Sequence, residues 1–291
     1  MNYILENELL HVEIAAHGAE IKEIKYQGKD LLHDSNPKFW GRSAPYLFPN
    51  IGTIKDKFTI FNNQEYPLTK HGFIRDFDFT LINKSNDKLV LQFKSNSDTL
   101  KLYPYEFIFT VEYQLNENEL LTNVLIKNLS NDSMPFNFGL HPAFRIPFDG
   151  GQFEDYQIKF SEALTSNLPL VNLSSGLIDW NQTFKEVKNL ESFKLNHEDY
   201  YQDALVFDKC PKEISIISPN GSMIKVKTSD FTKLGIWTPY PTKAPFICIE
   251  PWIGCADSPE SNHQFITKQD IIYLDKNQEW NINFSYQFII K

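Results

Sequence analysis

The feature that most constrains the fold is a pair of long segments in which apolar and polar residues alternate. The first covers residues 106–115 and the second covers residues 120–129, and the polar stretch Asn116–Glu119 separates them. Successive side chains of a strand point to opposite faces, so this period of two predicts strands with one buried face. The short polar connection predicts that the two strands pair as an antiparallel hairpin.

Strand patterns recur along most of the chain. Alternation also marks residues 87–94 and 280–289, and Asn220-Gly221 predicts a hairpin turn within 215–227. The 24 Phe and 13 Tyr residues favour a pleated, half-buried surface. Residues 149–200 show no clear pattern. Since all-β domains commonly reach 291 residues as one unit, we expect residues 1–291 to form a single all-β domain.

The charge balance disfavours several classes of partner. With 28 Lys and Arg against 37 Asp and Glu, the net charge is −9, and no long basic run interrupts it. Such a surface repels nucleic acids and anionic membranes. The N-terminal residues lack the pattern of a signal peptide and no apolar window reaches membrane-spanning length, so we expect a cytoplasmic protein.

The cysteines and glycines predict no cofactor. Three cysteines are too few and too irregular for a disulfide framework, and they fit reduced thiols. Cys248 and Cys255 flank Glu250 at a spacing that matches no common zinc pattern, so we expect no metal site. No glycine-rich phosphate loop is present.

Two apolar runs meet a titratable side chain. The run that starts at Phe246 reaches Glu250, and the run that starts at Met134 reaches His141. A carboxyl group at the end of a buried strand is partly desolvated, which raises its pKa and suits it to proton transfer. Glu250 and His141 are therefore our candidate base and acid, although a Glu at a strand exit can also simply reach water.

Further candidate residues precede these runs. Arg42 lies in a proline- and aromatic-rich loop and could bind hydroxyls or an anion, or pair with a local acid. His71 and Arg75 would share one face of an extended segment, and a core role for His71 is the alternative. Asp203 precedes an apolar strand, where turn formation is its ordinary role.

The segment before Pro142 predicts a strand that faces a ligand. Asn137, Gly139 and His141 would share one face of it, and the proline favours an extended backbone at His141. Four aromatic residues could stack on a ligand ring or pack in the core, namely Trp40, Tyr46, Trp237 and Trp252.

The chain resembles the aldose 1-epimerase (galactose mutarotase) family, and its LacX-like branch in particular. The shared motifs cover Arg42–Pro49, His71–Arg75, Gly139–Phe144, Asp203–Leu205 and Ile249–Ser258. The resemblance implies a large antiparallel β-sandwich with a sugar on its concave face. It also implies that His141 is the general acid, that Glu250 is the general base, and that His71 and Asp203 hold sugar oxygens. Thr53 departs from the branch, which often has Arg there.

The expected partner is therefore a small-molecule sugar, with three alternatives. A sugar-binding or sugar-sensing protein could keep the same face without catalysis, but it would not need both His141 and Glu250. A glycosidase would need two carboxylates, for which Asp203 and Glu250 are the available pair. A hexose 6-phosphate could be the substrate if Arg42 and Arg75 bind phosphate. The oligomeric state is not indicated.

Overall fold

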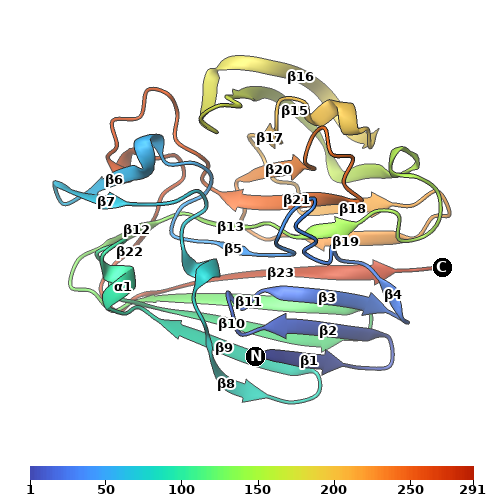
Figure 1. The fold of residues 1–291 in the computed structure, drawn as a ribbon, viewed down its shortest axis with the longest axis horizontal. Helices are drawn as coiled ribbons and strands as arrows, with labels where there is room; N and C mark the ends of the chain where they lie inside the picture. Colours follow the sequence, from blue (N-terminus) through green and yellow to red (C-terminus); the bar gives the residue numbers. More distant parts are fainter.

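The largest sheet of the computed structural model, which describes residues 1–291, has nine antiparallel strands. Residues 80–94, 107–128 and 279–289 form its lower part in Figure 1, and the sheet continues up to the strands of residues 157–194 at the top. In spatial order the strands are β16 (Ile178–Lys194), β15 (Gln157–Val171), β18 (Glu213–Ile217), β19 (Met223–Lys227), β23 (Glu279–Ile289), β11 (Glu119–Asn128), β10 (Phe107–Asn116), β9 (Lys88–Lys94) and β8 (Thr80–Lys84).

The predicted central hairpin is confirmed. β10 and β11 pair from Phe107 opposite Asn128 to Asn116 opposite Glu119, without a register shift. In β10 every second side chain, from Phe107 to Leu115, is buried, and the intervening ones are less buried. The alternation in the sequence therefore sets which face of the sheet meets the core.

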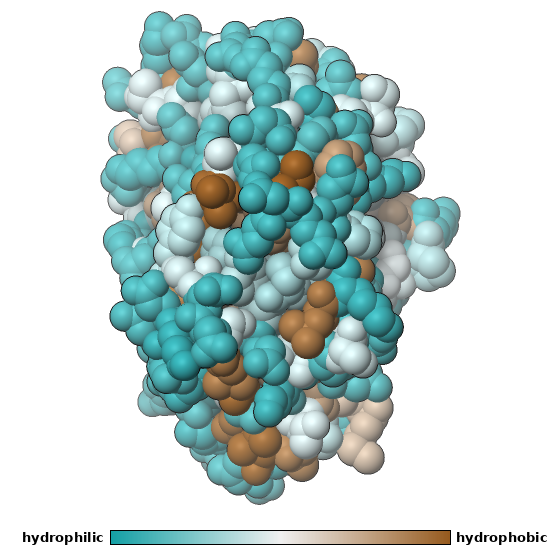
Figure 2. Space-filling view, turned by 90° about the vertical axis from the view of Figure 1, so that its left-hand side faces the viewer, coloured by the Kyte–Doolittle hydropathy of each residue, from teal (hydrophilic) through white to brown (hydrophobic).

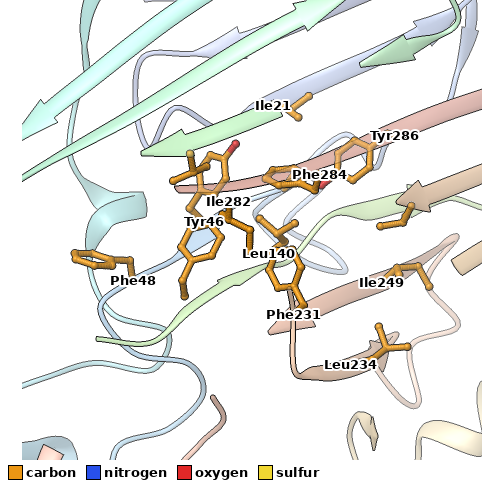
Figure 3. Packing of buried hydrophobic residues seen from close by; sticks show 14 of the residues in the cluster. Ile21, Tyr46, Phe48, Leu140, Phe231, Leu234, Ile249, Ile282, Phe284 and Tyr286 are labelled. Carbon is orange, nitrogen blue, oxygen red and sulfur yellow. The ribbon is translucent and has the colours of Figure 1, made fainter. Parts of the chain in front are cut away.

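A second sheet packs above the first and carries the residues of interest. Its strands are β17 (Leu205–Phe207), β20 (Lys233–Trp237), β21 (Phe246–Ile253), β13 (Phe138–Leu140) and β5 (Tyr46–Leu47), and β14 (Ala143–Arg145) also pairs with β21. Between the layers lies a cluster of 66 buried apolar residues. Figure 3 shows Leu140 and Ile249 of the upper sheet facing Phe284 and Tyr286 of β23. The structure is thus the expected all-β sandwich.

The remaining elements are short and extend the two layers. Small sheets contain β1 (Asn2–Glu6), β2 (Leu10–Ala15), β3 (Ile21–Tyr26) and β4 (Lys29–Asp30); β6 (Phe58–Phe61) and β7 (Gln64–Pro67); and β12 (Met134–Phe136) and β22 (Ile272–Leu274). The α-helix is α1 (Ser97–Leu100), and the 3-10 helices are η1 (Lys55–Lys57), η2 (Ile74–Asp76), η3 (Phe153–Asp155), η4 (His197–Tyr200) and η5 (Phe265–Thr267).

The segment without a clear sequence pattern forms mainly the long hairpin β15–β16, which rises at the top of Figure 1. Most β16 side chains are exposed or only partly buried. At the tip, however, Val171 and Ile178 are buried in a small cluster with Trp252 of β21. The tip of the hairpin therefore packs onto the upper sheet.

The surface is mainly hydrophilic on the face that carries β6, β7 and α1. Figure 2 shows this face with hydrophobic residues scattered among polar ones. Isolated apolar residues of this kind are normal on a protein surface. The chain has no helix with the length and apolarity required to cross a membrane.

Candidate active site

Glu250 lies within β21, a strand whose eight residues are all buried. The strand continues past Glu250 to Ile253 and is paired with β20 on one side and with β13 and β14 on the other. The expectation that Glu250 stands at a strand exit is therefore wrong. Gly235 of β20 is its register partner, and only 2% of the residue is exposed.

His141 follows β13 and faces Glu250. Its Nε2 atom lies 3.1 Å from Oε2 of Glu250, so one proton can pass between the two side chains. The Trp40 ring stacks on the imidazole at a centroid distance of 4.5 Å, and Trp237 meets it edge-on at 5.7 Å. His33 fixes Trp40, because His33 Nε2 donates to the Trp40 carbonyl oxygen at 2.9 Å. Aromatic neighbours thus hold the His141 ring in place beside Glu250.

Burial acts against charge on both members of this pair. It raises the pKa of Glu250 well above the ordinary carboxyl range, and the negative charge of Asp203 adds to this effect. Burial also lowers the pKa of His141 well below the ordinary histidine range, and the cations Arg75 and Lys70 lower it further. These opposite shifts widen the pH range over which the pair holds a single proton, and they make a protonated His141 more acidic than an ordinary imidazolium.

His71 is a neutral hydrogen-bond donor at the same cavity. Its Nδ1 atom accepts a hydrogen bond from the Gly52 backbone N–H at 3.1 Å, which leaves the proton on Nε2. Burial and the nearby His141 lower its pKa, so the ring stays uncharged. Its φ angle is +68°, and Arg75 lies in η2, which begins three residues after His71. The expectation of an extended segment through His71 and Arg75 is therefore wrong, although both residues line the cavity.

The cavity above this pair has a volume of about 360 Å³. All six candidate site residues line it, namely Arg42, His71, Arg75, His141, Asp203 and Glu250. Trp40, Trp237 and Trp252 add apolar walls, whereas Tyr46 lies in the core and bonds Tyr113. This combination of a few polar groups and aromatic walls suits a small amphipathic ligand.

Two glycines make room for Trp252. A Cβ atom on Gly139 would lie 2.8 Å from Cδ1 of this indole, and one on Gly235 would lie 2.6 Å from its Cζ2 and Cη2 atoms. Both distances are shorter than any normal carbon contact. Trp252 therefore fits against the backbone of β13 and β20. Asn137, expected beside Gly139 on the ligand-facing side, instead donates to the Gln269 and Asp270 carbonyl oxygens, and it does not line the cavity.

The two arginines at the cavity are engaged with protein groups. Arg42 pairs with Asp76, as the local-acid alternative predicted, and Nη1 of Arg42 donates to the Arg75 carbonyl oxygen. Nη2 of Arg75 donates to the Lys70 carbonyl oxygen at 2.6 Å, while its buried Nε has no partner. Burial lowers the pKa of Arg75 to about 10. The arginines thus brace this wall while retaining some donor capacity.

Two parts of the cavity wall were not predicted from the sequence, namely Lys70 and the tip of the β15–β16 hairpin. Lys70 lines the cavity, and its positive charge lowers the pKa of Glu250 against the effect of burial. Its place directly before His71 was an available signal. Val171, Gly176 and Ile178 line the opposite wall. Their polar surroundings in the sequence gave no comparable signal.

Comparisons with known proteins agree with this geometry. The model of the family described as aldose 1-epimerase matches residues 1–287. The plasmid and chromosomal forms of Protein LacX from Lactococcus lactis subsp. lactis are each 31% identical over 273 residues, which cover 90% of this chain and 91% of each relative.

Solved structures show the same fold. A galactose mutarotase related enzyme from Lactobacillus acidophilus is 31% identical, with a TM-score of 0.93 and full coverage of both chains. A galactose mutarotase-like protein from Lactobacillus casei is 26% identical, with a TM-score of 0.90 and coverage of 99% of this chain and 100% of that one.

Proposed function

Because the chain belongs to the aldose 1-epimerase family, we propose that it interconverts the α and β anomers of a hexose or related sugar through His141 and Glu250. The observation that carries this proposal is the 3.1 Å contact between Nε2 of His141 and Oε2 of Glu250 in a cavity large enough for one sugar. A carboxyl group and an imidazole that share one proton can both open and close a hemiacetal.

The reaction opens the ring by two proton transfers. Glu250, as carboxylate, takes the proton from the C1 hydroxyl while protonated His141 gives its proton to the ring oxygen, and the C1–O5 bond breaks. Rotation about C1–C2 then presents the other face of the aldehyde. Ring closure returns the proton from the O5 hydroxyl to His141 and the Glu250 proton to O1, so the pair ends in its starting state.

Neighbouring charges act on this distribution in both directions. Asp203 raises the pKa of Glu250, and the cations Arg75 and Lys70 lower the pKa of His141, which makes its protonated form more acidic. The positive charge of Lys70 lowers the pKa of Glu250 and so favours its carboxylate form. His71 can donate a hydrogen bond from Nε2–H to a sugar oxygen, and Asp203 can accept a hydrogen bond from a sugar hydroxyl. We propose both as substrate-binding residues. The apolar faces of Trp40, Trp237 and Trp252 can pack against the C–H faces of the ring.

Anomer exchange measured by NMR tests this function across free hexoses and pentoses. Glu250→Gln and His141→Asn each remove one proton carrier at nearly constant volume, so we expect kcat to fall by about 10²-fold or more. Glu260→Gln is the matched control, because Glu260 is exposed and does not line the cavity. Near-normal exchange in either folded catalytic variant would contradict the assignment. Sugar binding without exchange in the wild-type protein would instead support a non-catalytic sugar-binding role.

A phosphorylated hexose is a second candidate substrate. Three cations, Arg42, Lys70 and Arg75, line one side of the cavity. Arg42 is paired with Asp76, but Lys70 forms no salt bridge in the structure. This local positive charge can attract a phosphate group despite the net charge of −9.

A further inference from the structure

Cys248 lies beside the acid–base pair on the same strand. It precedes Glu250 by two residues in β21, so both side chains project from the same face of the sheet. Ligand atoms of His141, Cys248 and Glu250 lie within 4.8 Å of one another. His141 is 107 positions from Cys248 in the sequence, so the spacing of Cys248 and Cys255 could not reveal this set.

The three side chains are buried, and those of Cys248 and His141 have atoms without a hydrogen-bond partner. The exposed fractions are 0% for Cys248, 2% for Glu250 and 7% for His141. The thiols of Cys210 and Cys255 have oxygen partners, but none is found for Cys248. The buried Nδ1 atom of His141 also has no partner. These observations point to a set of donors that protein groups leave incompletely satisfied.

An imidazole nitrogen, a thiolate and a carboxylate are the ligands that Zn²⁺ takes in proteins. We propose that His141, Cys248 and Glu250 form an inhibitory binding site for Zn²⁺ or a similar soft divalent cation. The ion displaces two protons to solvent, the one that the pair shares and the one on the Cys248 thiol, and its fourth position faces the cavity, where water completes a tetrahedron. Bound zinc therefore blocks proton transfer in both directions.

Charge and distance both permit this site. A thiolate and a carboxylate neutralise the two charges of the ion, so no net charge is buried. Zinc bonds of about 2.0–2.3 Å place tetrahedral ligands about 3.3–3.8 Å apart, so a spread of up to 4.8 Å must contract by about 1 Å. Side-chain rotation can supply that movement. The cations Lys70, Arg42 and Arg75 at the same cavity oppose the ion and limit its affinity.

Zinc titration of anomer exchange tests the proposal. We expect inhibition that EDTA reverses, and we expect the half-inhibiting zinc concentration to rise at least about tenfold in Cys248→Ala. Cys210→Ala and Cys255→Ala are matched controls, since both residues are buried thiols outside the donor set, and their zinc sensitivity should equal that of the wild type. Equal sensitivity of Cys248→Ala and the wild type would overturn the proposal, as would an absence of inhibition.

Cobalt binding gives a readout that does not depend on activity. Co²⁺ added to the wild-type protein should give the thiolate-to-cobalt charge-transfer band and the intense visible bands of a tetrahedral site, and a sugar substrate should change them. A spectrum without a thiolate band refutes the site even if mutarotation is confirmed. A thiolate band that Cys248→Ala abolishes supports the site even if the protein shows no mutarotation.

Discussion

Gly235→Ala tests whether the position of Trp252 controls the active site. The new Cβ atom would lie 2.6 Å from Cζ2 and Cη2 of the indole, whereas carbon atoms pack at about 3.5–4.0 Å. The ring must therefore move by about 1 Å, and overpacking of this kind costs about 1–3 kcal/mol. Gly235 is also the register partner of Glu250, so the strain arises beside the proposed catalytic carboxyl group.

We expect kcat/KM for anomer exchange to fall about 10- to 100-fold in Gly235→Ala, because displacements near 1 Å can cost about 10²-fold. The Tm should fall by about 2–4 °C for each kcal/mol lost. Gly41→Ala is the control, since a Cβ atom there meets nothing within 4 Å. Trp252→Phe, which has a smaller ring, should restore part of the activity of Gly235→Ala. Activity within twofold of the wild type in Gly235→Ala would refute the reasoning.

Three further predictions follow from the charges at the cavity. The pH profile of kcat/KM should be bell-shaped. On the acid limb, below the ordinary histidine pKa, His141 binds the second proton of the pair, and on the alkaline limb Glu250 loses the last one. A flat profile contradicts this. Lys70→Met should move the alkaline limb to higher pH, because Lys70 lowers the pKa of Glu250, and an unchanged limb would exclude that role. If Arg42 and Arg75 recognise phosphate, the kcat/KM advantage of glucose 6-phosphate over glucose should fall at least about tenfold in Arg42→Ala and in Arg75→Ala. This prediction is contradicted if the wild type shows no such advantage, or if the advantage survives in both variants.

The sandwich could be predicted where one face of a strand is buried and the other is not. β10 and β11 show this alternation over ten residues each, and the structure keeps their predicted pairing. The hairpin β15–β16 could not be predicted in the same way. Most of β16 is exposed or only partly buried, and several register shifts interrupt its pairing, so no period of two survives in the sequence.

The candidate site could be predicted as a set of residues but not as a geometry. Apolar runs identified His141 and Glu250, because burial of a titratable group leaves a pattern in the sequence. The positive φ angle of His71 goes with tertiary contacts. The His71 ring accepts a hydrogen bond from the Gly52 backbone N–H, and the next residue, Gly72, forms a β-bridge with Phe48. The proximity of Cys248 to His141 likewise depends on the pairing of β14 with β21, which no local pattern encodes.

The β15–β16 hairpin supplies part of the cavity wall but neither of the proposed proton carriers. Its tip supplies Val171, Gly176 and Ile178, whereas His141 and Glu250 belong to the other sheet. Natural variation or a library confined to residues 171–178 can therefore reshape the space offered to a ligand while the proton carriers stay in place. A tip exchanged with that of a relative should transfer sugar preference as one unit, which makes this hairpin the natural module for altering the specificity of the protein.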